Sequence, residues 1–456
     1  MGFLFSFGQM VRSTDNRTQA ELLTEFDHAL GGLSLKTEKP TTYRKKDVVI
    51  ITLPSGVKIS EVLTDLGRPL GERYFLILSN FYVRGLLRKK VAGQQGNFLR
   101  AHRDTLRRLG GERYRKLIDY GLKQGHFIKS PKPFIQKIQA YEYRINSEVL
   151  SLKNQQRYEL TTVAAVRIRK ADLTKRKTDF AKTSEVHQKI VQSIDGLTFD
   201  YSAAIKFVAS LPDGETKDHR KNVIGLFLVG ETEWTTDKQG RNYTLMVSVP
   251  RNLRRFFSYG NQPLWVADIS SSQPLLHALL YPSDCDEKKK YLTIVEEGRF
   301  WEFMNDANGG TVDLDDPDER SEFKVQVFRE VFFSYPESKK GVTKTFAVIF
   351  KREFPVLWSE MNARKLQRKM KAAGPLAKAM QQTEAEAVFD AVLTLKDKPY
   401  PLITIHDAIV TTDNGVADVL GSINESFAPV GLNPPLSVKR LTYTPTDSKK
   451  VAKTTG

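Results

Sequence analysis

The sequence predicts a multidomain α+β protein, with a mostly helical N-terminal part and an antiparallel sheet in the C-terminal half. Its 456 residues are enough for two or three domains, and 40% hydrophobic with 27% charged residues is a typical globular composition. Apolar residues recur every three or four positions in RYFLILSNFYVRGLLRK (73–89), which predicts a helix. The runs LWVADI (264–269) and YPLITIHDAIVTT (400–412) instead predict strands.

The charge balance favours a polyanionic partner. The chain carries 70 Lys and Arg against 53 Asp and Glu, a net charge of +17, which favours nucleic acid before a membrane surface. The single cysteine, Cys285, excludes an intramolecular disulfide and a cysteine-based zinc site. No apolar run approaches the roughly 20 residues of a membrane span, and the N-terminal MGFLFSFGQM lacks the features of a signal peptide. We therefore expect an intracellular protein of the cytoplasm or nucleoid.

Residues 1–45 are predicted to form an N-terminal arm with a short helix near Gln19–Leu30, and residues 46–150 a first domain. A strand (47–53), helices at 59–66 and 112–125, and a hairpin built from HFI (126–128) and AYEYRI (140–145) are expected there. Helices followed by a hairpin with a basic loop are the outline of a winged helix, a nucleic-acid-binding domain. A small mixed domain with a solvated basic face is the alternative. The cations of this surface would be Arg113, Arg115, Lys116, Lys129, Lys132 and Lys137.

Residues 151–235 are predicted to be a helical connector between the first domain and a second domain at 236–445, and residues 446–456 a disordered tail. The connector contains the basic run RIRKADLTKRK (167–177). This run is most simply a solvated face, and the alternative is that it follows a phosphate backbone.

Two aspartates of the second domain follow or join apolar runs. Asp268 lies at the end of a predicted strand, and Asp407 lies where two alternating runs meet. Either one alone is most simply a turn residue. Together they supply the carboxylates of a two-metal phosphoryl-transfer site, which uses two Mg²⁺ ions, with Mn²⁺ as a substitute.

A predicted helix in the second domain carries two cations and two aromatic rings at a spacing of four residues. These are Arg320, Lys324, Phe328 and Phe332, and steps of four keep them near one helical face. Such a face suits a nucleotide, whose triphosphate meets the cations and whose base meets the rings. The alternative is an amphipathic helix whose apolar stripe ends in Arg and Lys. The preceding acidic run DLDDPDE (313–319) is predicted to cap this helix.

Five motifs in order resemble those of family A polymerases, the DNA polymerases related to bacterial polymerase I and the single-subunit RNA polymerases. Short phage and mobile-element members share the DI-x-x-SQP form of the first motif. The resemblance covers roughly 235–445 and implies an antiparallel palm sheet with helical fingers, preceded by a thumb-like region at 151–235. The motifs are Gly240-Arg241, DISSSQP (268–274), the R-x₃-K-x₃-F-x₃-F helix, LAKAMQQTEAEA (376–387) and IHDA (405–408).

The resemblance also implies roles for individual residues. Asp268 and Asp407 would bind the metal ions, and Lys324 would also protonate the leaving group. Nucleotide-binding residues would be Arg320, Lys324, Phe328, Phe332 and Gln273, of which Gln273 lies at the position that selects the sugar. Nucleic-acid-binding residues would be Arg241, Gln381 and His406, to which the basic segment before Asp268 adds Arg254 and Arg255.

The expected function is therefore DNA-directed DNA synthesis from a primer and template, with nucleoside triphosphates as substrates, no proofreading, and a monomeric enzyme. A single-subunit RNA polymerase or primase is the alternative, with RNA as a partner, because Gln273 can crowd or bind a 2′-hydroxyl. A second alternative is a catalytically weak DNA-binding replication initiator or regulator. Two departures from the family pattern, Arg329 and Phe333 in place of glycines, favour that second alternative.

Overall fold

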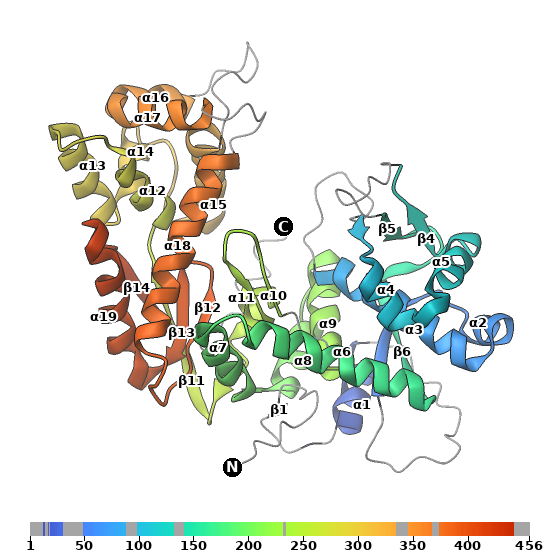
Figure 1. The fold of residues 1–456 in the computed structure, drawn as a ribbon. Coiled ribbons are helices and arrows are strands. Elements are labelled where there is room, and N and C mark those ends of the chain that lie inside the picture. Colours follow the sequence, from blue (N-terminus) through green and yellow to red (C-terminus); the bar gives the residue numbers. More distant parts are fainter. Residues whose placement is uncertain are drawn as a thin grey trace.

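The structure is a computed structural model that describes residues 12–13, 17, 19–30, 49–87, 98–131, 141–230, 234–333, 345–366 and 374–441. It is a mixed helix and strand fold with two separate hydrophobic cores, in agreement with the predicted α+β class (Figure 1). The smaller core is formed by residues between 51 and 165, and the larger by residues 22–30 together with residues between 180 and 432. No described helix is long and apolar enough to cross a membrane.

The smaller core lies between a two-stranded sheet and a helical layer. Strand β2 (Val49–Ser55) pairs antiparallel with β6 (Ser151–Leu160), and helices α2 (Ile59–Leu66) and α3 (Arg68–Leu87) follow β2. The long α3 buries several large rings because its apolar residues recur at helical spacing. Those rings are Tyr74, Phe75, Phe81 and Tyr82, each at most 1% exposed.

A second, three-stranded sheet completes this part of the chain. Its strands are β3 (Leu99–Arg100), β4 (Phe127–Lys129) and β5 (Glu142–Ile145), in the order β3-β5-β4, and helices α4 (Arg103–Gly110) and α5 (Tyr114–Lys123) lie between β3 and β4 in sequence. The predicted strand, helices and antiparallel strand pair are all present. Gly125 has a φ of 68°, a conformation that glycine accommodates after a helix. Lys132 and Lys137 lie outside the described residues.

Two boundaries differ from those expected. Strand β6, placed in the connector by the sequence, belongs to the smaller core through its pairing with β2, so that this core extends to Ala165 rather than to residue 150. Helix α1 (Gln19–Leu30) has the predicted bounds. It was expected to belong to an N-terminal arm, but it packs in the larger core, where Leu22 and Phe26 are fully buried. Strand β1 (Arg12–Ser13) likewise joins the large sheet, parallel to β7. Both contacts join segments far apart in sequence, which local patterns cannot reveal.

The region between the two cores is largely helical. Helix α6 (Val163–Ala181) joins them, because Ala165 is buried in the smaller core and Phe180 in the larger. The next elements along the chain are α7 (Glu185–Asp195), β7 (Leu197–Phe199), α8 (Tyr201–Ala209), α9 (Glu215–Leu228), β8 (Thr235–Thr236), β9 (Asn242–Tyr243), α10 (Leu245–Ser248) and α11 (Arg251–Arg254).

The large sheet carries the segments of interest for function. Its strand order is β1-β7-β10-β11-β13-β12, with β14 paired to β11, and all pairs except β1 with β7 are antiparallel. Its C-terminal strands are β10 (Phe257–Tyr259), β11 (Gln262–Ile269), β12 (Ile403–Ile405), β13 (Ala408–Thr412) and β14 (Leu436–Leu441).

Helices pack around this sheet. Helices α18 and α19 contact each other, α19 lies against β11 and β13, and α18 lies against α12. Their bounds, with those of the remaining helices, are α12 (Ser272–His277), α13 (Asp286–Glu296), α14 (Phe300–Asp306), α15 (Pro317–Val327), α16 (Thr345–Glu353), α17 (Pro355–Leu366), α18 (Gly374–Thr394) and α19 (Val416–Phe427).

Helix α15 begins as predicted but ends differently. The Asp316 side chain accepts from the backbone N–H groups of Asp318 and Glu319, both at 2.9 Å, so the acidic run does cap the helix. The single helical face predicted from Arg320 to Phe332 is interrupted, because the segment Phe328–Phe332 is a π-helix. A π-helix adds residues to each turn and rotates its side chains away from the face of the preceding α-helix.

Candidate active site

Strand pairing brings Asp268 and Asp407 together. Strands β12 and β13 form a hairpin in which Ile405 pairs with Ala408, leaving His406 and Asp407 as a two-residue turn. His406 has a φ of 56°, as such tight turns require. Asp268 pairs with Ala408, the residue after Asp407, and the backbone N–H of Ile269 donates to the carbonyl of Asp407 at 3.2 Å. The two predicted acids therefore lie on neighbouring segments at one end of the sheet.

The site is electrostatically unusual. The pKa of Asp268 is raised to about 6, first by burial and then by the negative charge of Asp407. Lys439, Arg251 and Lys324 act in the opposite direction, so three cations lie within electrostatic reach of this carboxylate. Two half-desolvated acids beside one another are unfavourable unless positive charge offsets them.

Of the two cations predicted on helix α15, Lys324 is the one that acts on Asp268. Its pKa is lowered, first by burial and then by Arg320, while the charge of Asp268 opposes this shift. The Lys324 ammonium also lies 5.1 Å from the centre of the Trp301 ring. Arg320 instead donates to Glu302 and to the carbonyl of Leu314, both at 3.1 Å. A phosphate that binds Arg320 would have to replace these partners.

The two predicted aromatic contacts differ in exposure. Phe328 is half-buried, with its ring 5.3 Å from Trp301 and stacked on Phe333 at an interplanar angle of 12°. Phe332 is 1% exposed and packs against His277, with ring centres 4.6 Å apart. In this structure Phe332 is therefore a core residue, and of the two rings only Phe328 is partly accessible.

A buried hydrogen-bond network lies behind the acids. Its centre is Glu384 on α18, which is 1% exposed. Glu384 accepts from Ser272 Oγ at 2.8 Å and from Gln273 Nε2 at 2.7 Å, and it forms an ion pair with Arg241. The Ser272 hydroxyl also lies 2.9 Å from Asp407 Oδ2. Because a hydroxyl has one proton, it can donate to only one of the two carboxylates at a time.

The pKa of Glu384 is raised, first by burial and then by Asp407, while Arg241 lowers it. Gln273 is 9% exposed, and its Oε1 is buried with no hydrogen-bond partner. The predicted sugar-contacting residue is thus oriented by Glu384 rather than extended toward solvent. Glu384 thus contacts Arg241 and Gln273 directly, and Ser272 lies between Glu384 and Asp407.

Only some of the other predicted nucleic-acid-binding residues lie close to one another. His406 lies close to Arg241 and Arg254, whose charges lower its pKa in addition to burial, the largest cause. Arg254 is itself held by the Val249 carbonyl at 3.0 Å, and burial lowers its pKa to about 10. Arg255 lies over the Phe207 ring at 5.7 Å, and Gln381 is half-buried on α18.

Four residues near the site were not predicted from the sequence. Ser272 is adjacent to Gln273, and Glu384 follows Gln381 by three positions on the same helix, so both lie within the five sequence motifs. Arg251 lies in the basic segment before Asp268. Lys439 is brought in by β14, where Ser437 pairs with Asp268, and no local signal indicates that pairing. These four are Ser272, Glu384, Arg251 and Lys439.

Two carboxylates suit Mg²⁺ better than a metal ion that needs all its ligands from the protein. Among the described residues, no group of three or more His, Cys, Asp and Glu side chains is arranged to hold a metal ion. Mg²⁺ is commonly held by one or two carboxylates and takes its remaining ligands from water and substrate phosphates. Asp268 and Asp407 fit that description, and a divalent cation would relieve the repulsion that raises the pKa of Asp268.

Of three comparisons with known proteins, only the one with solved structures gives matches. No protein-family model matches the chain, and a comparison with curated proteins gives no match. Among solved structures, the chain is similar to the POL domain of Pol1 from M. smegmatis in complex with DNA primer-template and dNTP, with 12% identity and a TM-score of 0.36. The match covers 59% of this chain and 65% of that one. A likeness this distant identifies neither a family nor an activity.

Proposed function

We propose that this chain is a template-directed nucleotidyltransferase that extends a 3′-hydroxyl, and specifically a DNA-directed DNA polymerase without proofreading. The observation that supports it is the pair of carboxylates, Asp268 at the end of β11 and Asp407 in the turn before the adjacent β13, with Lys324 in electrostatic reach of Asp268. The order of the five sequence motifs, which resemble those of family A polymerases, supports the same assignment. Nucleic acid and nucleoside triphosphates would be its partners.

Each residue would contribute a distinct part of the chemistry. Bound Mg²⁺ ions, or Mn²⁺ as a substitute, would be held by Asp268 and Asp407 and would activate the attacking hydroxyl and stabilise the leaving pyrophosphate. Lys324 and Arg320 would bind the triphosphate, and the lowered pKa of Lys324 makes its proton easier to transfer to the leaving group. Phe328 would pack beside the nucleotide. Glu384 would orient Gln273 at the sugar.

The test is extension of a labelled primer on a DNA template with Mg²⁺ and either dNTPs or rNTPs. Asp407→Asn and Asp268→Asn should each lower the extension rate by at least about a thousandfold, because each removes a charge needed in the transition state. Asp413→Asn, an exposed acid after β13, is the matched control and should retain the rate. Extension that survives in Asp407→Asn would refute the two-carboxylate assignment.

The same assay separates the alternatives. Faster extension with rNTPs, or synthesis without a primer, would indicate an RNA polymerase or primase. A DNA-binding initiator is the second candidate, favoured by the helix and strand order from α3 to β5 and by the exposed cations Arg113, Arg115 and Lys116 in and beside α5. Tight binding to DNA in a separate binding assay, with no incorporation of either nucleotide type, would support that candidate.

A further inference from the structure

Helix α6 separates its charges onto two sides. On its inner side Asp172 is fully buried and forms ion pairs with Arg108, with Arg176 at 2.5 Å and with Arg169 at 3.7 Å. A buried carboxylate among several guanidinium groups is well compensated. The inner cations of the basic run therefore already have a structural partner.

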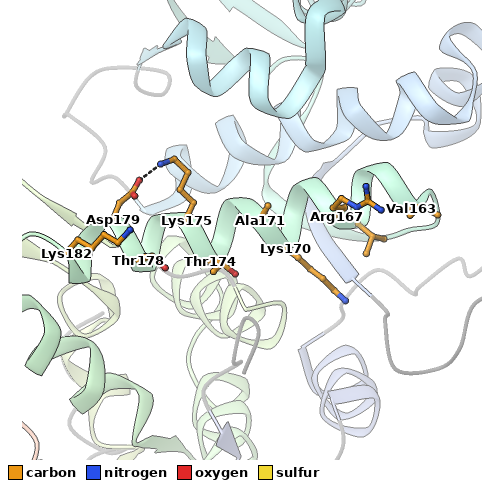
Figure 2. A pocket seen from close by; sticks show the side chains of 10 residues that line it. Val163, Arg167, Lys170, Ala171, Thr174, Lys175, Thr178, Asp179 and Lys182 are labelled. Atoms are coloured by element: carbon orange, nitrogen blue, oxygen red, sulfur yellow. Dashed lines mark hydrogen bonds and ion pairs between the residues drawn. The ribbon is translucent and has the colours of Figure 1, made fainter. Parts of the chain in front are cut away.

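The outer side of α6 lines an open groove of about 680 Å³ (Figure 2). Four cations and one carboxylate line it, a net charge of +3, and the carboxylate, Asp179, is paired with Lys175 at 2.7 Å. Two threonine hydroxyls lie between the charged residues along the same helix. The polar lining residues are Arg167, Lys170, Thr174, Lys175, Thr178, Asp179 and Lys182.

Most of the polar lining residues form a stripe along α6 rather than a compact cluster. Arg167, Lys170, Thr174, Thr178 and Lys182 follow one another by three or four positions, which keeps them on one helical face. The stripe is about 22 Å long at 1.5 Å per residue. One strand of duplex DNA presents about six phosphates over that length. An extended polyanion fits this stripe better than a single small anion.

The chemistry of the lining indicates which part of a nucleic acid it would contact. Lys, Arg and Thr are typical phosphate-binding side chains. None of the ten described lining residues is aromatic, so these residues offer no surface on which bases could stack. The only exposed large apolar side chain among them is Val163, which is too little for an apolar membrane contact.

We propose that the outer face of α6 binds the phosphate backbone of nucleic acid, independently of base sequence. The proposal extends the proposed function, since α6 joins the two cores and the larger one carries Asp268 and Asp407 (Figure 1). Helix α6 would then bind the nucleic-acid substrate at a place other than Asp268 and Asp407. The overall charge of +17 supports the same class of partner.

The test is DNA binding by fluorescence anisotropy across a series of salt concentrations, without nucleotides, using a labelled duplex and a labelled single strand. The variant combines Arg167→Gln, Lys170→Gln and Lys182→Gln. Three lost phosphate contacts should lower the slope of log K against log salt by about 2 to 3, and affinity at 0.15 M salt by about a hundredfold for duplex. Arg167→Gln alone, at an exposed position, should lower the slope by about 0.9.

The matched control combines Lys288→Gln, Lys289→Gln and Lys290→Gln in α13. It lowers the net charge of +17 by the same three units but leaves α6 unchanged. A slope that falls in the α6 variant and not in the control supports the proposal. An unchanged slope in the α6 variant, or an equal fall in both, overturns it. Asp407→Asn should retain the wild-type slope even if extension is lost, so binding by α6 and catalysis are tested separately.

Discussion

Replacement of Glu384 by alanine tests the buried network most directly. The change leaves Arg241, Ser272 and Gln273 without their shared acceptor, at a position that is 1% exposed. Breaking a buried ion pair costs about 3 to 5 kcal/mol, and each neutral hydrogen bond adds about 1 kcal/mol, offset in part by relaxation. We expect Glu384→Ala to lower the free energy of unfolding of the larger core by about 4 kcal/mol.

Tryptophan fluorescence during urea unfolding reports this core selectively. All four tryptophans lie between residues 234 and 358, within the part of the chain that forms the larger core. The matched control is Glu386→Ala, which removes an exposed acid on the same helix that accepts a hydrogen bond from Gln382 at 2.8 Å. That variant should change the free energy of unfolding by less than about 0.5 kcal/mol.

A double-mutant cycle with Arg241→Ala distinguishes the ion pair from a general loss of packing. If Arg241 and Glu384 stabilise each other as the structure indicates, the double variant should be about 2 to 3 kcal/mol more stable than the sum of the single effects predicts. Glu384→Gln, which keeps the shape and one acceptor, should fall between wild type and Glu384→Ala. Additive single effects, or a Glu384→Ala effect no larger than that of Glu386→Ala, would refute the assigned network.

Three further predictions concern single buried groups. Asp268→Asn should stabilise the protein by about 1 kcal/mol at pH 7.5 in metal-free buffer, because it removes repulsion from Asp407; thermal melts would check this, and added Mg²⁺ should narrow the difference. Burial lowers the pKa of His277 to about 4. As pH falls from about 6.5 to 4, the unfolded chain therefore binds a proton at this residue before the folded chain does, and the free energy of unfolding falls by about 3 kcal/mol. His277→Gln should reduce that loss, whereas the exposed His28→Gln should not. Glu72→Gln should destabilise the smaller core by about 2 to 4 kcal/mol, because the fully buried carboxylate accepts hydrogen bonds from Tyr158 and from the backbone and hydroxyls of Thr161 and Thr162. Unfolding followed by circular dichroism should detect this loss. An equal shift in the transition followed by tryptophan fluorescence would contradict it.

Local patterns in the sequence predicted local structure well. Helices α2 and α3, strand β2 and the β4–β5 pair follow from apolar periodicity and turn residues, which act over a few positions. The N-cap at Asp316 follows from side-chain chemistry alone. The pairing of Asp268 beside Asp407 was suggested by two strand ends, and the strand register supplies it.

Features set by contacts between distant segments were not predictable in the same way. The π-helical turn at Phe328–Phe332 departs from the regular spacing that placed Phe332 beside a nucleotide. No pattern in the sequence distinguishes Glu384 from the other acids of α18. Its place in the network depends on the approach of Arg241 and α12. Lys439 reaches the site through β14, whose register no single-sequence pattern specifies.

The position of α1 has a consequence for the order in which the chain can fold during synthesis. Arg17 donates to Ser202 at 2.7 Å, and α1 packs against α8 and α9, about 180 residues later in the chain. A ribosome releases residues 49–165 before those partners exist, so the smaller core can form while α1 still exposes Leu22 and Phe26. Helix α1 is therefore made before the smaller core but can reach its native place only after it, once α8 and α9 have been made.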